Sequence, residues 1–253
     1  MNFVDTHCHL DAAEFGDTQA DIVRNAAAVG VTRLVIPSVA CNNFEAVRKL
    51  CKQHPGCSPA YGIHPMYTND ATPRDLETLR EFLKQHSAVA VGEIGLDFFI
   101  KHYDQTRQEH FFVEQLKLAR DFDLPVLLHI RRAQDTILKH LRQIKVRGGI
   151  AHAFNGSRQQ ADEFIKLGFK LGFGGAMTHS RATKLRELAA TLPLESIVLE
   201  TDAPDIPPDF LERGLSNEPK YLPRIALTLA ELRGTSLEEI ARATTENACS
   251  VLS

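Results

Sequence analysis

The sequence is 253 residues long, with 43% hydrophobic and 24% charged residues. These fractions are ordinary for a globular protein and exclude a disordered, collagen-like or coiled-coil chain. The net charge of −3 excludes a protein that binds nucleic acid through bulk positive charge. There is no run of about 18 apolar residues, so we expect no membrane span.

The cysteines and the first residues indicate the compartment. The five cysteines form an odd set without a C-x-x-C pair, and the first residues lack the basic and apolar regions of a secretory signal. Reduced thiols are the usual state of such a chain. We therefore expect a cytoplasmic protein.

Short apolar, β-branched runs alternate with longer amphipathic segments from end to end. In chain order the predicted strands are Phe3–Thr6, Thr32–Pro37, Ser58–Ile63, Ala88–Glu93, Val126–Arg131, Gly149–Ala153, Phe169–Phe173 and Ser196–Thr201. Between the fourth and the fifth, apolar residues at helical spacing predict a helix over Asp104–Asp123. Eight strand–helix units predict an α/β fold, a single (β/α)8 TIM barrel with residues 1–253 as one domain. A doubly wound open sheet is the alternative, but its glycine-rich first turn is missing.

The longest irregular connection predicted is Asp202–Pro219, which contains four of the twelve prolines. It follows the eighth predicted strand. Because a barrel carries its active site on the loops after its strands, this connection is expected to border the site.

Six potential metal ligands fall where predicted strands end. They are His7 and His9 at the first strand, Glu93 at the fourth, His129 at the fifth, His152 at the sixth and Asp202 at the eighth. His7 and His9 are two residues apart in an extended segment, so their side chains point to the same side. A buried polar group without a partner costs about 1–3 kcal/mol. Six such groups at one end of a barrel have a common explanation in bound divalent metal.

A single buried histidine is more often a hydrogen-bonded core residue than a ligand, and the metal interpretation depends on the whole set. We interpret the remaining histidines on predicted helices and loops as surface or structural residues: His54, His86, His102, His110, His140 and His179. His64 follows the third strand, and it either contacts substrate or caps its loop. Glu200 either orients a ligand or forms a buried ion pair with an arginine or a lysine, and Asp97 either orients a ligand or anchors a loop.

Several blocks of the chain together resemble a known family. They are Asp5-Thr6-His7-Cys8-His9-Leu10, Gly62-Ile63-His64-Pro65, Gly92-Glu93-Ile94-Gly95-Leu96-Asp97, His129-x-Arg131, His152-x-Phe154-x-Gly156 and Glu200-Thr201-Asp202-x-Pro204. In this order they resemble the TatD family of metal-dependent deoxyribonucleases, which belongs to the amidohydrolase superfamily of metal-bearing (β/α)8 barrels. The resemblance runs from about Phe3 to the last helix. It implies metal-dependent phosphoester hydrolysis, with 3′-to-5′ DNA exonuclease activity described for some members.

The resemblance also implies roles for the candidate ligands. It implies one divalent ion on His7, His9 and Asp202 and a second ion on His129 and His152. Glu93 would bridge the two ions. Asp202 would also be a catalytic residue, which accepts the proton of the attacking water. Four imidazoles favour Zn²⁺ or Mn²⁺ over Mg²⁺, whereas the family is associated with Mg²⁺, so the element stays open.

Two positions depart from the usual pattern of the family. Arg131 is followed by Arg132 where members often have aspartate, and Pro204 is followed by Asp205 where they often have an aromatic residue. The first change adds positive charge and the second adds negative charge at the mouth of the site. The natural substrate therefore stays open between DNA, RNA and a small phosphodiester.

Two divalent ions about 3.5–4 Å apart activate a shared water near neutral pH and polarise a phosphoryl oxygen. We expect in-line attack of that water on phosphorus, with Asp202 accepting its proton and Arg131 and His64 binding substrate. One alternative is hydrolysis of a small phosphoester, carboxylic ester or amide at the same site. Another is a non-catalytic barrel that binds metal or nucleic acid. We expect a monomer without an obligate protein partner.

Overall fold

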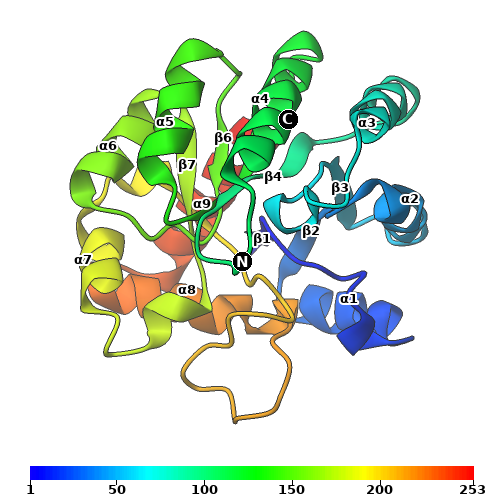
Figure 1. Ribbon diagram of the computed structural model, residues 1–253. Helices are drawn as coiled ribbons and strands as arrows, with labels where there is room; N and C mark the ends of the chain where they lie inside the picture. The colour runs from blue at the N-terminus through cyan, green and yellow to red at the C-terminus, as the bar shows by residue number, and fades with distance from the viewer.

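Eight parallel strands, each paired with the next in the chain, form the centre of a computed structural model that describes residues 1–253 (Figure 1). The strands are β1 Phe3–Asp5, β2 Val31–Pro37, β3 Cys57–Tyr61, β4 Ala90–Asp97, β5 Val126–Arg131, β6 Gly149–Ala151, β7 Phe169–Phe173 and β8 Ile197–Leu199. The ring closes where the Thr6 amide donates to the Leu199 carbonyl over 3.1 Å and where Cys8 bridges Ala203. The (β/α)8 barrel predicted from the sequence is confirmed.

Helices lie outside the strands all round the barrel (Figure 1). They are α1 Gln19–Ala28, α2 Phe44–Gln53, α3 Pro73–Gln85, α4 Gln105–Asp121, α5 Gln134–Gln143, α6 Arg158–Lys166, α7 Thr183–Thr191, α8 Leu222–Arg233 and α9 Leu237–Leu252. Side chains that accept hydrogen bonds from backbone amides start several of them, as Asp104 does for α4 and Ser157 for α6. No helix is long and apolar enough to cross a membrane.

The amino-terminal end of the barrel is filled with apolar side chains. One residue from each of seven strands belongs to this cluster: Val4, Val35, Ala60, Ala90, Leu127, Ile150 and Val198. Three residues of α9 complete it, namely Ala248, Val251 and Leu252. The helix α9 therefore seals this end of the barrel. The strand residues that face the outer helices join a larger apolar cluster, as expected for parallel strands covered on both sides.

The strand boundaries differ from the predicted ones near the site. β4 runs on to Asp97 rather than ending at Glu93, whereas β1 ends at Asp5 and β6 at Ala151. The extension of β4 depends on Gly95, because a Cβ at this position would lie 2.0 Å from the His129 carbonyl oxygen. The backbones of β4 and β5 approach too closely there for any other residue.

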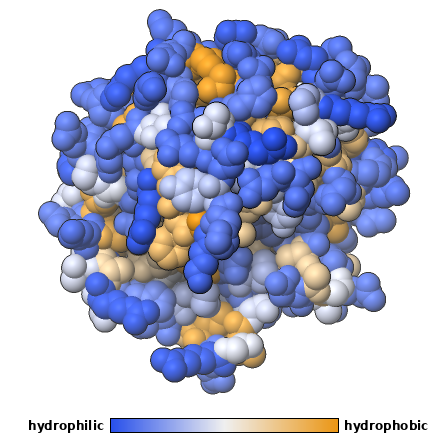
Figure 2. All heavy atoms as spheres, viewed as in Figure 1, coloured by the Kyte–Doolittle hydropathy of each residue, from blue (hydrophilic) through white to orange (hydrophobic).

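The segment between β8 and α8 is irregular over most of its length, as the prolines predicted. It is drawn in orange and projects from the lower edge of the barrel in Figure 1. The face seen in the same view is mostly hydrophilic, with apolar patches scattered across it (Figure 2). Among the exposed large apolar side chains is Phe99, just beyond the end of β4.

Candidate metal centre

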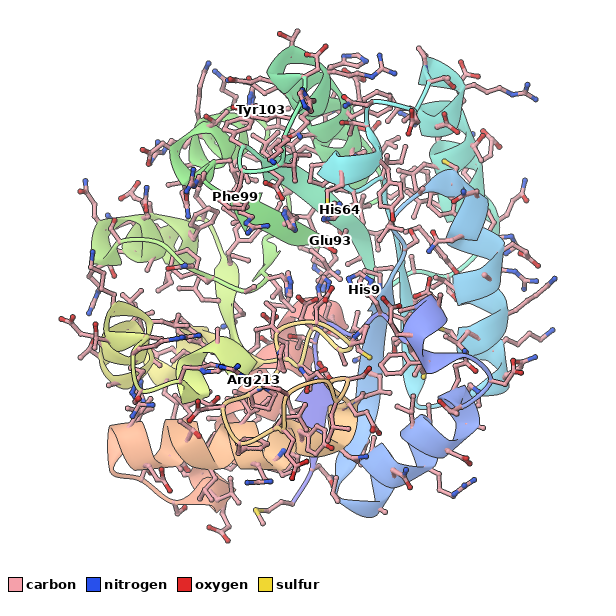
Figure 3. The ribbon with its side chains drawn as sticks, turned by 60° about the horizontal axis from the view of Figure 1, so that its bottom comes forward. His9, His64, Glu93, Phe99, Tyr103 and Arg213 are labelled. Atoms are coloured by element: carbon pink, nitrogen blue, oxygen red, sulfur yellow. The ribbon has the colours of Figure 1, made fainter.

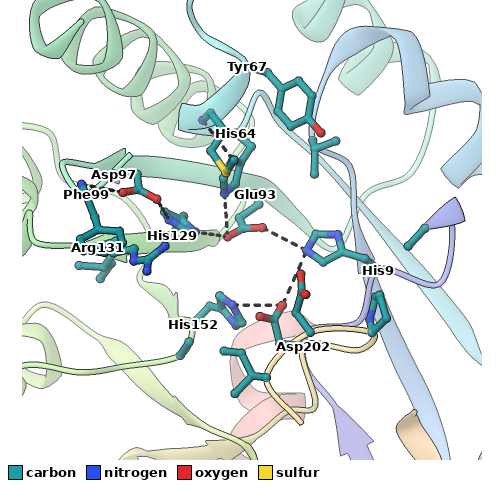
Figure 4. A pocket seen from close by; sticks show the side chains of 18 of the residues that line it. His9, His64, Tyr67, Glu93, Asp97, Phe99, His129, Arg131, His152 and Asp202 are labelled. Atoms are coloured by element: carbon teal, nitrogen blue, oxygen red, sulfur yellow. Dashed lines mark hydrogen bonds and ion pairs between the residues drawn. The ribbon is translucent and has the colours of Figure 1, made fainter. Parts of the chain in front are cut away.

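Imidazoles and carboxylates converge at the carboxyl end of the strands (Figures 3 and 4). The His7 Nε2 atom lies 3.1 Å from Glu93 Oε2 and 3.2 Å from His9 Nε2. The Asp202 Oδ1 atom lies 3.8 Å from each of these two imidazole nitrogens and 3.4 Å from His152 Nε2. The expectation that His7 and His9 point to the same side is therefore met.

Glu93 lies at the centre of the cluster and is only 2% exposed. Its Oε2 atom faces His7 and His9, while its Oε1 atom lies 2.9 Å from His129 Nδ1 and 3.6 Å from His64 Nε2. The two oxygens of one carboxylate thus face two different sets of imidazoles. This is the arrangement that a carboxylate bridging two cations requires.

Three groups of side chains each offer ligand atoms within 4.8 Å of one another. They are His7, Glu93 and His152; His7, His9 and Asp202; and His64, Glu93 and His129. All six ligands predicted from the sequence are therefore brought together, with His64 beside them. His129 and His152 do not share a group, so the division of ligands between two ions stays a prediction.

The donor set fits divalent metal. Two imidazole nitrogens facing each other at 3.2 Å can share only one proton, and the buried His7 Nδ1 atom has no hydrogen-bond partner. The His7 and His152 rings are stacked, with centroids 3.6 Å apart. With the imidazoles counted as neutral, as they are when they bind metal, six carboxylates against two guanidiniums give the surrounding cavity a formal charge of four negative. Two divalent cations would balance that charge.

Two further carboxylates orient histidines of the cluster. His129 Nε2 lies 3.0 Å from Asp97 Oδ2, so this ring is held between Asp97 and Glu93. His152 Nδ1 forms an ion pair with Glu200 Oε1 at 3.0 Å, without the geometry of a hydrogen bond, and this oxygen accepts from the Ala153 amide over 2.6 Å. Carboxylates in these positions fix the orientation of a ligating imidazole and raise its basicity. For Glu200 the structure supports the orienting interpretation, because its ion-pair partner is His152 rather than an arginine or a lysine, and Asp97 orients His129 in the same way.

Asp97 also anchors a loop, so the second interpretation applies to it as well. Its Oδ1 atom accepts from the Phe99 amide over 2.9 Å and from the Ile100 amide over 3.2 Å. One carboxylate therefore connects His129 to the loop after β4. From the sequence these two roles were alternatives, because nothing in it reveals that both oxygens of Asp97 are used.

The cluster shifts the pKa values of its members in opposite directions. Burial lowers the pKa of His64 to about 3, so its ring is neutral at pH 7. Burial also opposes the charged form of His129, but hydrogen bonds with Asp97 and Glu93 prevail and raise its pKa to about 9. For Asp202, burial is outweighed by the nearby His152, which lowers the pKa of the carboxyl below its ordinary value. Asp202 is consequently a carboxylate at neutral pH.

The cluster forms the floor of an open cavity of about 1020 Å³. Arg131, Arg132 and Phe99 line it on one side, after β4 and β5. Three carboxylates line it on the other side, after β1 and β8, namely Asp11, Glu14 and Asp205. Arg131 is thus at the cavity, as predicted, and so are both residues that depart from the family pattern.

The other histidines are absent from the cavity lining. His140 is buried and its Nε2 atom lies 3.0 Å from Glu109 Oε2, while His179 Nε2 lies 3.1 Å from the Pro207 carbonyl oxygen. These contacts match the structural role expected for them. Phe99, Asp11 and Glu14 are cavity residues that sequence reasoning missed. For Phe99, the available signal was its position two residues after Asp97 at the end of a strand.

Comparison with known proteins gives matches along the whole chain. The family described as TatD related DNase matches residues 4–253. The chain is 43% identical over 249 residues to the uncharacterized metal-dependent hydrolase YjjV of Escherichia coli K12, covering 97% of this chain and 95% of YjjV. It is 33% identical over 251 residues to the 3′-5′ ssDNA/RNA exonuclease TatD of Pantoea sp. At-9b, covering 96% of each.

A solved structure matches equally well. The crystal structure of YjjV, a TatD homologue from Escherichia coli K12, gives a TM-score of 0.95 at 40% identity and covers 99% of this chain and 97% of that one. Similarity of this extent in both sequence and fold identifies a family rather than a shared architecture. The chain belongs to the TatD family of metal-dependent hydrolases.

Proposed function

We propose that this protein is a two-metal phosphodiesterase that removes nucleotides from an end of single-stranded DNA. The observation that carries the proposal is the convergence of four imidazoles and two carboxylates on the floor of an open cavity that also holds two arginines. A relative that is 33% identical is named as a 3′-5′ ssDNA/RNA exonuclease, which supports the choice of a nucleic acid strand and of 3′-to-5′ polarity.

The metal ligands follow the sequence assignment. His7, His9 and Asp202 would hold one ion, His129 and His152 the second, and Glu93 would bridge both. Bound divalent ions supply Lewis acidity towards a phosphoryl oxygen and lower the pKa of water. Zn²⁺, Mn²⁺ and Mg²⁺ are the candidates, because the imidazoles favour the first two and the carboxylate oxygens suit the third.

Asp202 takes the proton of the attacking water. Its carboxylate is charged at neutral pH, because the neighbouring His152 holds its pKa below the ordinary range against the effect of burial. Its backbone has a φ of 57°, a region that residues other than glycine rarely adopt. The Asp202 amide donates to the His7 carbonyl over 2.9 Å, which helps to hold this conformation and directs the carboxylate into the cluster.

His64 and Arg131 bind the substrate. The His64 Nδ1 atom accepts from the Met66 amide over 3.2 Å, so the neutral ring carries its proton on Nε2, which faces the cluster. This N–H can donate to a phosphoryl oxygen. Arg131 ends β5 two residues after His129 and therefore points to the same side of the strand, where its guanidinium can pair with phosphate oxygens.

The test is hydrolysis of single-stranded DNA by metal-stripped protein titrated with Mg²⁺, Mn²⁺ or Zn²⁺. With 5′-labelled substrate we expect a ladder that shortens stepwise and only with metal, and with 3′-labelled substrate early release of a labelled mononucleotide. Asp202→Asn is expected to remove nearly all turnover and to keep the circular dichroism spectrum. Absence of cleavage with every metal, in protein that binds metal, would contradict the proposal.

The alternatives are separated by the same preparation. A carboxylic ester and a small phosphomonoester assayed beside the DNA would reveal a different hydrolase, and DNA binding without metal-dependent turnover would indicate a non-catalytic barrel. Organisation as one domain over residues 1–253, a monomeric state and a cytoplasmic location also remain predictions.

A further inference from the structure

Two arginines and a phenylalanine form a cluster on one wall of the cavity. The Cζ atoms of Arg131 and Arg132 lie 3.9 and 4.5 Å from the centroid of the Phe99 ring, which is 46% exposed. Several surface arginines are paired with carboxylates, as Arg80 and Arg142 are at 3.1 and 2.7 Å, whereas Arg224 stacks singly on Phe210 outside the cavity. The side chains of Arg131 and Arg132 form no hydrogen bond or ion pair. Two guanidiniums thus share one aromatic ring with all their donors free for an anionic ligand.

The backbone holds this cluster beside the metal centre. Arg132 has a φ of 57°, an unfavourable conformation for a long side chain. The Asp97 carboxylate accepts hydrogen bonds from the Phe99 and Ile100 amides with one oxygen and contacts His129 with the other. In Figure 3 Phe99 lies to one side of His64 and Glu93, and all three residues line the cavity. The cluster is therefore attached to the metal centre without belonging to its ligand set.

The opposite wall carries the opposite charge. Asp11 and Glu14 follow β1, and Asp205 follows β8. In a ring of eight strands, β8 and β1 lie across the barrel from β4 and β5, which lead to the arginine cluster. Beyond the metal ligands, a phosphate entering this side would meet three carboxylates and no lysine or arginine side chain.

We propose that Phe99, Arg131 and Arg132 form a subsite for a second phosphate, next to the one held at the metal centre. The carboxylates of Asp11, Glu14 and Asp205 exclude phosphate from the other side. The substrate is then the end of a single-stranded oligonucleotide, whose charged remainder extends only along the arginine wall. This inference rests on the proposed phosphodiesterase function and names the part of the substrate that the cavity accepts.

The first experiment compares two substrates of the metal-loaded protein. Thymidine 5′-(p-nitrophenyl phosphate) has one phosphate, whereas a thymidine tetranucleotide has additional phosphates. Because Arg131 also binds the substrate at the metal centre, the double variant Arg131→Ala/Arg132→Ala is expected to raise KM for both substrates, but to raise KM for the tetranucleotide at least about fivefold more than KM for the single phosphodiester. The slope of log(kcat/KM) against log[KCl] should become shallower by about one to two for the tetranucleotide.

Matched variants separate the subsite from general charge and from folding. Lys52→Ala removes one exposed positive charge at the end of α2, outside the cavity lining, and should leave both substrates unchanged. Arg132→Gly keeps the backbone conformation that Arg132 adopts and should behave like Arg132→Ala. Arg132→Lys should keep the salt slope but lose part of the affinity. Equal effects on both substrates, or no effect on either, would overturn the proposal.

The exclusion of phosphate by Asp11, Glu14 and Asp205 is tested with oligonucleotides that carry a phosphate at one end. One of the two tetranucleotides that carry a 5′- or a 3′-terminal phosphate is expected to be cleaved at least about fivefold more slowly than the unmodified strand, because its extra phosphate meets Asp205. Asp205→Asn should recover a large part of that loss. If both phosphorylated strands were cleaved at the unmodified rate, the exclusion would be refuted.

Binding distinguishes failure of this inference from failure of the proposed function. If the metal-loaded protein hydrolyses neither substrate, the anisotropy of a fluorescein-labelled tetranucleotide still measures the subsite. Weaker binding by the double variant than by Lys52→Ala, with a reduced salt slope, would support the subsite in a protein that is not a phosphodiesterase. Equal binding by the double variant and Lys52→Ala would overturn it.

Discussion

The two ends of the barrel both contain fully buried side chains, but these are chemically opposite. At the amino-terminal end, side chains such as Val35, Leu127 and Val198 fill the interior against α9 and need no partner. At the carboxyl end, His7 and Glu93 are equally inaccessible, yet they carry groups that are costly to bury. The apolar end stabilises the fold by itself, whereas the polar end is stable only with compensating charge. Folding and chemistry are thus assigned to different ends of the same strands.

The largest loss of activity is expected from a substitution of Glu93, because both of its carboxylate oxygens face imidazoles. Glu93→Gln removes the charge that would bridge two cations, and we expect kcat/KM to fall by about 10³-fold or more. Saturating metal should raise the melting temperature of the wild type and raise that of the variant much less. Metal content by mass spectrometry and thermal scans measure both effects.

Glu109→Gln is the matched control, since Glu109 pairs with His140 outside the cavity. It should leave turnover and metal content unchanged. A Glu93→Gln protein that kept two ions and wild-type turnover would remove the distinction between the polar end and the rest of the barrel.

The opposite result is expected at the apolar end. Leu127→Ala deletes a fully buried side chain and should lower the free energy of unfolding by about 2–5 kcal/mol. Metal content and kcat should stay at the wild-type level, because Leu127 belongs to the cluster sealed by α9. Leu227→Ala on the exposed face of α8 should change stability by less than about 0.5 kcal/mol. Urea unfolding measures the change in stability, and metal analysis measures the metal content of each variant. Loss of metal from Leu127→Ala would mean that the two ends are coupled.

The same contrast explains how far the sequence predicted the structure. The strands were found because apolar runs repeat, and the ligands were found because single histidines and carboxylates interrupt those runs. The end of β4 was placed four residues too early, since Glu93 looked like a terminus although Gly95 lets the strand continue. Phe99 and the double use of Asp97 escaped prediction. Both depend on contacts between loops that no periodicity records.

A glycine tests how the polar end is held in place. A Cβ at Gly172 on β7 would lie 2.2 Å from Glu200 Oε2 and 2.6 Å from Glu200 Cδ, so Gly172→Ala must displace that carboxylate. His152 would then lose its orienting partner. We expect metal affinity to fall by about 10–100-fold, the usual effect of losing such a partner. Titration calorimetry with Zn²⁺ measures this loss.

Glu200→Gln shows whether Gly172→Ala acts through Glu200. If it does, the double variant Gly172→Ala/Glu200→Gln should bind metal with about the same affinity as whichever single variant has the lower affinity, because both changes remove the same contact. Losses that add up would assign Gly172 a separate role in the strand.

The smallest effect is a pH dependence that only the polar end can have. Between Asp97 and Glu93 the pKa of His129 is raised to about 9, so below that pH the metal-free ring is protonated and a metal ion must displace the proton. His129 alone should therefore weaken metal binding by about tenfold for each pH unit between 9 and 7. Asp97→Asn keeps an acceptor for the Phe99 amide but removes the charge, which should move the pKa of His129 down towards its ordinary value. Calorimetry in two buffers of different ionisation enthalpy should then show about one proton fewer released per protein at pH 8. An unchanged proton count would mean that Asp97 acts on the loop alone, and the polar end would be held together by Glu93 without help from its second carboxylate.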